Sequence, residues 1–109
     1  MEWKPIPGTH YSASESGDIF NTSTGRILKP VERGNGYAVV VLHDRQEYVH
    51  RVVLYAFTGI VGDEANHLNR DKLDNRLCNL EWVTRKENSQ HYWRSLVMEM
   101  EAAGQLRLL

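Results

Sequence analysis

Four polar side chains in the second half of the chain are best suited to chemistry. Asn66 and His67 are adjacent, Asn79 follows His67 by twelve positions, and Asn88 follows Asn79 by nine. Of the four, only His67 titrates near neutrality, which suits a general base that takes a proton from water. Amide carbonyl oxygens are hard ligands that Mg²⁺ accepts. The residue types therefore predict a small polar site that combines a proton acceptor with a cation.

Short strands and turns are expected in the first half of the chain. Apolar pieces around 19–20 and 26–29 are separated by Gly, Asn and Ser, which supply the backbone angles of tight turns. The β-rich runs 37–43 and 48–49 flank a short polar loop and predict a hairpin. We therefore expect a small antiparallel β-sheet over residues 1–48.

The second half of the chain predicts the elements that carry the polar site. Residues 51–57 (RVVLYAF) are apolar and Gly59 follows them, which indicates a short buried helix that ends at glycine. A long loop rich in Asn and Asp leads to a predicted strand at 80–83. Thr84 and Glu87 then fit a capping box for a helix from about residue 85. A hairpin packed on this helix would bring the four polar side chains to one edge.

Composition sets limits on the class of protein. A chain of 109 residues makes one domain, and none of its segments approaches the roughly 20 apolar residues of a membrane helix. We therefore expect a cytosolic protein without membrane contact. The one cysteine, Cys78, excludes an internal disulfide and paired-cysteine zinc sites, and we expect it to be a buried apolar residue. The net charge of −1 is not the overall signature of a nucleic-acid binder.

Residues 49–91, which contain VHRVVLYAF and NHLNRDKLDNRLCNLEWVTRKEN, resemble the HNH endonucleases of the ββα-metal type found in phage and intron homing enzymes. The sequence upstream resembles the small β-rich module that often precedes the nuclease in those enzymes. The resemblance implies an α+β fold. A small antiparallel β-sheet over 1–48 would be followed by the nuclease motif and a C-terminal helix over 49–109, together forming one compact unit.

The resemblance also implies a role for each polar residue. His67 would be the general base that activates water for attack on a DNA phosphodiester. Asn66 and Asn88 would hold one divalent metal ion, Mg²⁺ or Mn²⁺, and Asn79 would bond across the loop to orient the His67 ring. His91, one helical turn after Asn88, is an auxiliary candidate. The predicted activity is metal-dependent hydrolysis of double-stranded DNA, by nicking unless the protein dimerises.

Two alternatives follow from individual residues. Many relatives place an acidic residue directly before the histidine, where this chain has the neutral Asn66. We therefore expect weak metal affinity without DNA, and the alternative function is a DNA-binding or protein-binding phage accessory protein on an inactivated nuclease scaffold. His50 precedes an apolar helix, so we interpret it as structural rather than as a second metal ligand.

Contacts with DNA and with partners are predicted from basic residues and one apolar stripe. The hairpin at 37–49 is the expected DNA reader, because a two-stranded ribbon fits the major groove. The DNA-binding candidates are Arg33, Arg45, Arg70, Lys72, Arg76, Arg85 and Lys86. The stripe of Tyr92, Leu96, Met100 and Ala103 is a candidate homodimer seam or protein-partner surface. A phage-encoded chain would act in the host cytoplasm.

Overall fold

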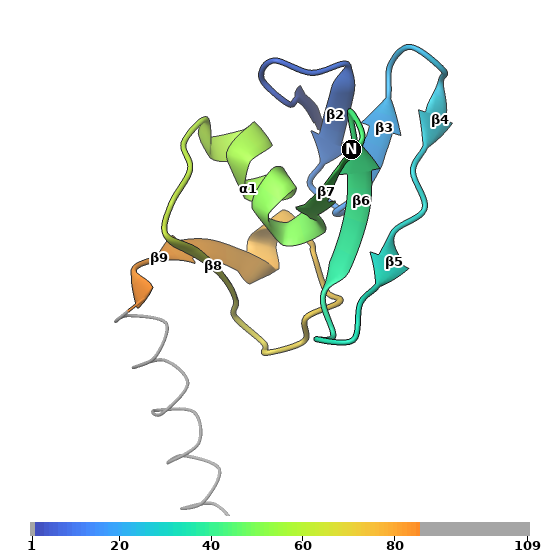
Figure 1. The fold of residues 1–109 in the computed structure, drawn as a ribbon. Helices are drawn as coiled ribbons and strands as arrows, with labels where there is room; N and C mark the ends of the chain where they lie inside the picture. Colours follow the sequence, from blue (N-terminus) through green and yellow to red (C-terminus); the bar gives the residue numbers. More distant parts are fainter. Residues whose placement is uncertain (1, 86–109) are drawn as a thin grey trace, which may run out of the picture.

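The computed structural model describes residues 2–85 of the chain, and its first sheet comes from the N-terminal residues (Figure 1). This sheet is antiparallel with the order β1-β2-β3-β4. Its strands are β1 (Trp3–Pro5), β2 (Tyr11–Ser14), β3 (Ile19–Asn21) and β4 (Arg26–Ile27). Turns rich in Gly, Ser and Asn connect them, as the sequence predicts.

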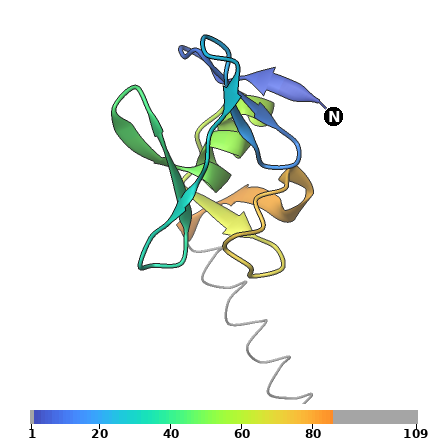
Figure 2. The same ribbon diagram turned by 90° about the vertical axis from the view of Figure 1, so that its right-hand side faces the viewer.

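A second antiparallel sheet leads directly into the helix. It contains β5 (Val31–Glu32), β6 (Ala38–Leu42) and β7 (Arg45–Tyr48), and the β6–β7 hairpin projects to one side of the molecule in Figure 2. Helix α1 (Val49–Thr58) follows without a loop. It ends at Gly59, whose φ of 74° is the left-handed conformation that glycine adopts most easily.

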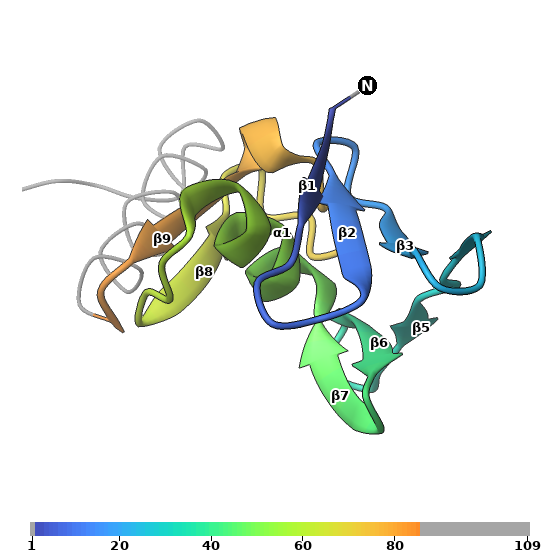
Figure 3. The same ribbon diagram turned by 90° about the horizontal axis from the view of Figure 1, so that it is seen from above.

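The third sheet is the hairpin that carries the polar residues. Strand β8 (Glu64–His67) pairs antiparallel with β9 (Leu80–Val83), and a long loop with the 3-10 turn η1 (Leu77–Asn79) joins them. Seen from above in Figure 3, α1 lies between this hairpin and strands β1 and β2, and α1 contacts all of them. The helix therefore connects the N-terminal sheet to the polar hairpin.

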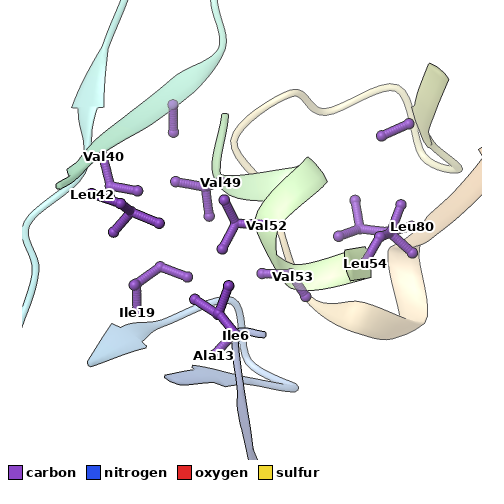
Figure 4. Packing of buried hydrophobic residues seen from close by; sticks show 12 residues of the cluster. Ile6, Ala13, Ile19, Val40, Leu42, Val49, Val52, Val53, Leu54 and Leu80 are labelled. Carbon is purple, nitrogen blue, oxygen red and sulfur yellow. The ribbon is translucent and has the colours of Figure 1, made fainter. Parts of the chain in front are cut away.

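The hydrophobic core surrounds α1 (Figure 4). Val49 and Val53 of the helix are almost completely buried, and Ile19 from the first sheet is buried with them. Leu54 meets Leu80 on the other side of the helix, as Figure 4 shows. Burying an aliphatic side chain of this size contributes about 1.5–3 kcal/mol. The same helix thus holds the N-terminal sheet and the β8–β9 hairpin on one core.

The α+β class is confirmed, and the helix and the ββ hairpin follow the β-rich part in the predicted order, but that part contains two antiparallel sheets where one was predicted. Helix α1 begins at Val49, two residues before the predicted start, and β7 (Arg45–Tyr48) covers most of the segment that was predicted as the polar loop of the hairpin. Strands β1, β2 and β5 were not predicted individually. Cys78 is exposed, so the prediction that it is buried was wrong. It lies in η1, on the loop side of the hairpin.

The predicted C-terminal helix and its apolar stripe lie outside the described residues, and so does the capping partner Glu87. The homodimer seam therefore stays a prediction. Within residues 2–85, no helix is both long enough and apolar enough to cross a membrane.

Candidate active site

Strand β8 places Asn66 and His67 at the end of the hairpin. Asn66 pairs with Glu81, and His67 pairs with Leu80, in the register of β8 and β9. Both side chains are buried, with 8% of Asn66 and 5% of His67 exposed. Because successive side chains of a strand point to opposite faces, Asn66 and His67 meet different surroundings.

The His67 ring is held by a loop amide. Its Nε2 lies 2.8 Å from Oδ1 of Asn75, which is itself buried. An amide oxygen only accepts hydrogen bonds, so this contact places the proton of the neutral ring on Nε2. The lone pair is then on Nδ1, the nitrogen that remains available to accept a proton.

Asn79 closes the loop that contains Asn75. Its Oδ1 accepts the backbone N–H of Asn69 at 3.0 Å, and its Nδ2 donates to Oδ1 of Asn69 at 2.9 Å and to the carbonyl of Asp74 at 2.8 Å. Asn79 thus bonds across the loop, and its role in orienting the His67 ring stays a prediction. The amide on the His67 ring, however, belongs to Asn75, which sequence reasoning passed over.

Aromatic rings pack against His67. The His50 ring of α1 lies 4.8 Å from the His67 ring, centroid to centroid. Tyr37, just before β6, stacks on His50 at 5.1 Å with 13° between the planes, and Tyr48 meets His50 edge-on. His50 is thus part of a ring stack, in agreement with a structural role. Sequence reasoning did not single out Tyr37, and nothing in its local pattern marks it.

Burial keeps His50 neutral. Desolvation lowers the pKa of His50 to about 3, and the neighbouring charges of His67 and Arg51 act in the same direction. The ring beside His67 therefore carries no positive charge at physiological pH. A proton gained by His67 does not meet a like charge on His50.

The surroundings of Asn66 are acidic. Its Nδ2 donates to Oε1 of Glu81 at 3.1 Å, across the hairpin. This bond turns the nitrogen of the Asn66 amide toward the Glu81 carboxylate. Sequence reasoning missed Glu81, although the alternation of a hairpin places it opposite Asn66.

The donor chemistry around Asn66 fits a hard divalent cation. An amide oxygen and a nearby carboxylate are the ligand types that Mg²⁺ and Mn²⁺ prefer. Residues 2–85 contain no group of three or more His, Cys, Asp or Glu side chains placed to hold a metal. Asn88 and the auxiliary candidate His91 lie outside the described residues.

Several of the basic candidates are already engaged within the protein. Arg76 forms a two-pronged contact with Asp74, Nε to Oδ1 at 2.8 Å and Nη2 to Oδ2 at 2.7 Å. This pairing lowers the pKa of Asp74 and raises that of Arg76. Arg85 contacts Glu64 at 3.2 Å. Lys72 donates to the carbonyl of Asn35 at 3.0 Å and lies over the Tyr37 ring.

The other basic candidates lie on loops and on the projecting hairpin. Arg33 is exposed in the turn between β5 and β6, and Arg45 is exposed at the start of β7. Arg70 is exposed in the loop after β8, with a positive φ of 65°. Lys86 lies outside the described residues.

Family models match both halves of the chain. The HNH endonuclease model matches residues 47–90, and the NUMOD4 motif matches residues 1–43. The sequence is 31% identical to DNA endonuclease I-HmuI of Bacillus phage SP01, over 97% of this chain and 66% of that protein. The chain belongs to the HNH endonuclease family.

Other relatives agree with this HNH assignment. An uncharacterized HNH endonuclease of Acanthamoeba polyphaga mimivirus, L247, is 39% identical over 82% of this chain, which spans 25% of the viral protein. The solved structure described as DNA binding and cleavage by the HNH homing endonuclease I-HmuI matches with a TM-score of 0.69 and 30% identity. That match covers 99% of this chain and 62% of the other.

Proposed function

We propose that the protein is a DNA endonuclease that hydrolyses phosphodiester bonds, with His67 as the general base. The observation that carries this proposal is the bond between Nε2 of His67 and Oδ1 of Asn75, beside Asn66 in the HNH-matched part of the chain. This arrangement provides an oriented proton acceptor directly after an amide residue of the same strand, which is a candidate metal ligand. A positioned base and a bound metal ion each promote the attack of water on a phosphodiester.

The proton step follows from the surroundings of His67. Nδ1 takes the proton from the attacking water, and the imidazolium that forms keeps its Nε2–H bond to Asn75. In the described residues, every side-chain nitrogen or oxygen that is fully buried has a hydrogen-bond partner. Nδ1 of His67 has no such partner among these residues, so it is accessible to solvent. The neutral His50 beside the ring adds no repulsion to the imidazolium.

Asn66 and Asn88 are the proposed ligands of one divalent ion, Mg²⁺ or Mn²⁺. When bound, the ion stabilises negative charge on the phosphate and on the leaving oxygen. Glu81 orients the Asn66 amide and adds a negative charge to a site that lacks the acidic residue of many relatives. His91 remains an auxiliary candidate.

Double-stranded DNA is the proposed substrate, with the β6–β7 hairpin as the reader. Arg33 and Arg45 are exposed near its ends. With one proposed site per chain and a net charge of −1, we propose nicking with modest DNA affinity. The relatives are phage and giant-virus proteins, so the proposed place of action is the host cytoplasm.

A plasmid assay tests the proposal. Supercoiled plasmid is incubated with the protein and Mg²⁺ or Mn²⁺ at several salt concentrations, with EDTA as the blank. We expect nicked circles from the wild type, none from His67→Ala, and normal nicking from His10→Ala, which removes an exposed histidine remote from the site. Unchanged cleavage by His67→Ala would eliminate His67 as the base.

The neutral Asn66 and the internally engaged basic residues favour one second function, a binding protein on an inactivated nuclease scaffold. In this case the wild type would cleave no plasmid under any metal. DNA binding, measured by fluorescence anisotropy, would then be the same with EDTA as with Mn²⁺, and Asn88→Ala would not change it.

A further inference from the structure

We propose that the turn between β2 and β3, residues 14–18, is a positioning element for His67. The turn acts through Asn75, and Gly17 is the residue that permits their contact. The inference rests on the proposed role of His67 as a base. It assigns to the N-terminal sheet a part in the orientation of the active-site ring, although the two are far apart in the sequence.

Gly17 lies against the backbone of Asn75. A Cβ atom on Gly17 would be 2.6 Å from the carbonyl oxygen of Asn75 and 2.9 Å from its carbonyl carbon. Cβ atoms do not approach other backbones so closely, and a backbone carbonyl does not move aside as the end of a long side chain does. The φ of 91° at Gly17 is also in the region that favours glycine. Any larger residue would therefore push Asn75 or the turn away.

A second contact fixes the same segment to the same turn. The backbone N–H of Leu77 donates to the carbonyl of Glu15 at 2.8 Å. The two contacts lie on either side of Arg76, so the turn packs on Asn75 and is hydrogen-bonded to Leu77 two residues later. Figure 2 shows this blue turn reaching the yellow and orange loop that follows β8.

The turn itself is well braced. The N–H of Ser14 donates to the carbonyl of Asp18 at 2.9 Å, and the N–H of Gly17 donates to the carbonyl of Ser14 at 3.0 Å. The hydroxyl of Ser14, a completely buried residue, accepts the N–H of Asp18 at 3.1 Å. A turn held by these hydrogen bonds fixes the position of Asn75. The 2.8 Å contact between Nε2 of His67 and Oδ1 of Asn75 in turn fixes the His67 ring.

Two alanine variants isolate this contact. Gly17 and Gly25 both have positive φ, 91° and 74°, but nothing lies within 4 Å of a Cβ on Gly25. Gly17→Ala and Gly25→Ala thus both place a side chain at a positive φ, and only the first displaces Asn75. In the plasmid assay we expect nicking by Gly17→Ala to fall by about tenfold or more relative to Gly25→Ala, with similar DNA affinity, because small displacements of catalytic groups are costly.

Ring NMR provides a readout that does not depend on cleavage. Long-range ¹H–¹⁵N spectra distinguish a proton on Nε2 from one on Nδ1, and His67→Ala identifies the His67 signals. We expect a single Nε2–H form in the wild type and in Gly25→Ala. Gly17→Ala and Asn75→Ala should each give a mixture of the two forms.

A double-mutant cycle separates positioning from general destabilisation. If Gly17 acts through Asn75, adding Gly17→Ala to Asn75→Ala lowers the melting temperature further but hardly changes the nicking rate. Additive losses in rate would overturn the inference, and so would a Gly17→Ala protein with the wild-type ring spectrum. If the wild type does not cleave, the proposed function fails, while the ring spectra still decide the contact.

A measurement on the unmodified protein covers the case in which Gly17→Ala does not fold. Hydrogen exchange of the Leu77 amide reports opening of the turn, and loss of the His67 Nε2–H signal reports release of the ring. We expect the exchange rate of the Leu77 amide and the loss of the His67 Nε2–H signal to depend on denaturant concentration in the same way. Exchange at Leu77 by a local opening that leaves the ring signal intact would contradict the inference.

Discussion

His67 and Asn66 are neighbours in strand β8, yet the protein builds their surroundings differently. His67 meets a ring from α1, a loop amide and, through that amide, a turn of the first sheet. Asn66 meets the carboxylate of Glu81 on the paired strand. His67, the proposed base, is therefore contacted by segments from much of the described chain, whereas Asn66, a proposed metal ligand, is bonded to the other strand of its own hairpin.

This difference separates two requirements of hydrolysis. A base must present one nitrogen of a particular tautomer, which takes several fixed contacts. Mg²⁺ keeps several waters and is usually bound through one or two protein side chains and the phosphates of the substrate, so fewer fixed side chains are needed. We therefore expect substitutions around His67 to change the rate and substitutions around Asn66 to change the metal affinity.

The largest effect is expected for Asn75→Ala. Without Oδ1 of Asn75, the His67 ring loses the contact that selects its tautomer and orientation, so nicking should fall by about 100-fold with metal affinity unchanged. Asn21→Ala, which removes an amide at the end of β3 that accepts the backbone N–H of Ser23, is the matched control. Single-turnover plasmid nicking provides the rates. An equal loss of metal affinity would show that the two halves of the site are not separable.

Glu81→Gln tests the other half of the comparison. The substitution keeps the shape of the side chain but removes the negative charge beside Asn66, so we expect the Kd for Mn²⁺ to rise by about tenfold. Glu32→Gln removes an exposed charge from β5 and should leave the Kd unchanged. The Kd of each variant is measured by titration with Mn²⁺, in which electron paramagnetic resonance detects the free ion. A Kd equal to that of the wild type would mean that Glu81 does not act on the cation.

His50→Phe should change how stability depends on pH. In the unfolded chain His50 binds a proton below pH 6.5, whereas in the folded protein its pKa is lowered to about 3 by burial and by the charges of His67 and Arg51. Stability from this group is therefore present above pH 6.5 and is lost as the pH falls toward 3. Between pH 7 and pH 5 the loss is about 2 kcal/mol.

The measurement compares urea unfolding of the wild type and His50→Phe at both pH values. Phe keeps the ring stack on Tyr37 and removes the titrating nitrogen. The groups facing His50, namely His67, Tyr37 and Tyr48, remain in both proteins, so the difference between the two slopes isolates His50. The same pH dependence in both would show that burial does not keep His50 neutral.

Local patterns predicted the parts of the fold that depend on neighbouring residues. Gly59 marks the end of α1, and β9 matches the predicted strand at 80–83 because its apolar residues alternate between flanking polar segments. The start of α1 was placed two residues late because no capping side chain marks it. Strand β5 has two exposed residues, so its sequence contains no burial pattern.

The candidate site could be predicted only in part, because some of its contacts join residues that no local sequence pattern connects. The resemblance identified Asn66, His67 and Asn79, whose spacing is visible in the sequence. Asn75 lies in the same loop among other Asn and Asp residues, and only the folded path of the loop shows which amide contacts the ring. The packing of Gly17 on Asn75 depends on tertiary structure alone, so no local pattern could reveal it.

The smallest predicted effect concerns the basic residues. Arg45 is exposed on the β6–β7 hairpin, whereas Arg76 is neutralised by Asp74. If Arg45 contacts a phosphate, Arg45→Ala lowers the slope of log affinity against log salt by about one. Removing the Arg76 pair with Arg76→Gln and Asp74→Asn together should leave the slope unchanged, because the pair releases no counterion. Anisotropy titrations with duplex DNA measure both slopes, and a reduced slope for the double variant alone would place the DNA on the β8–β9 loop instead of the hairpin.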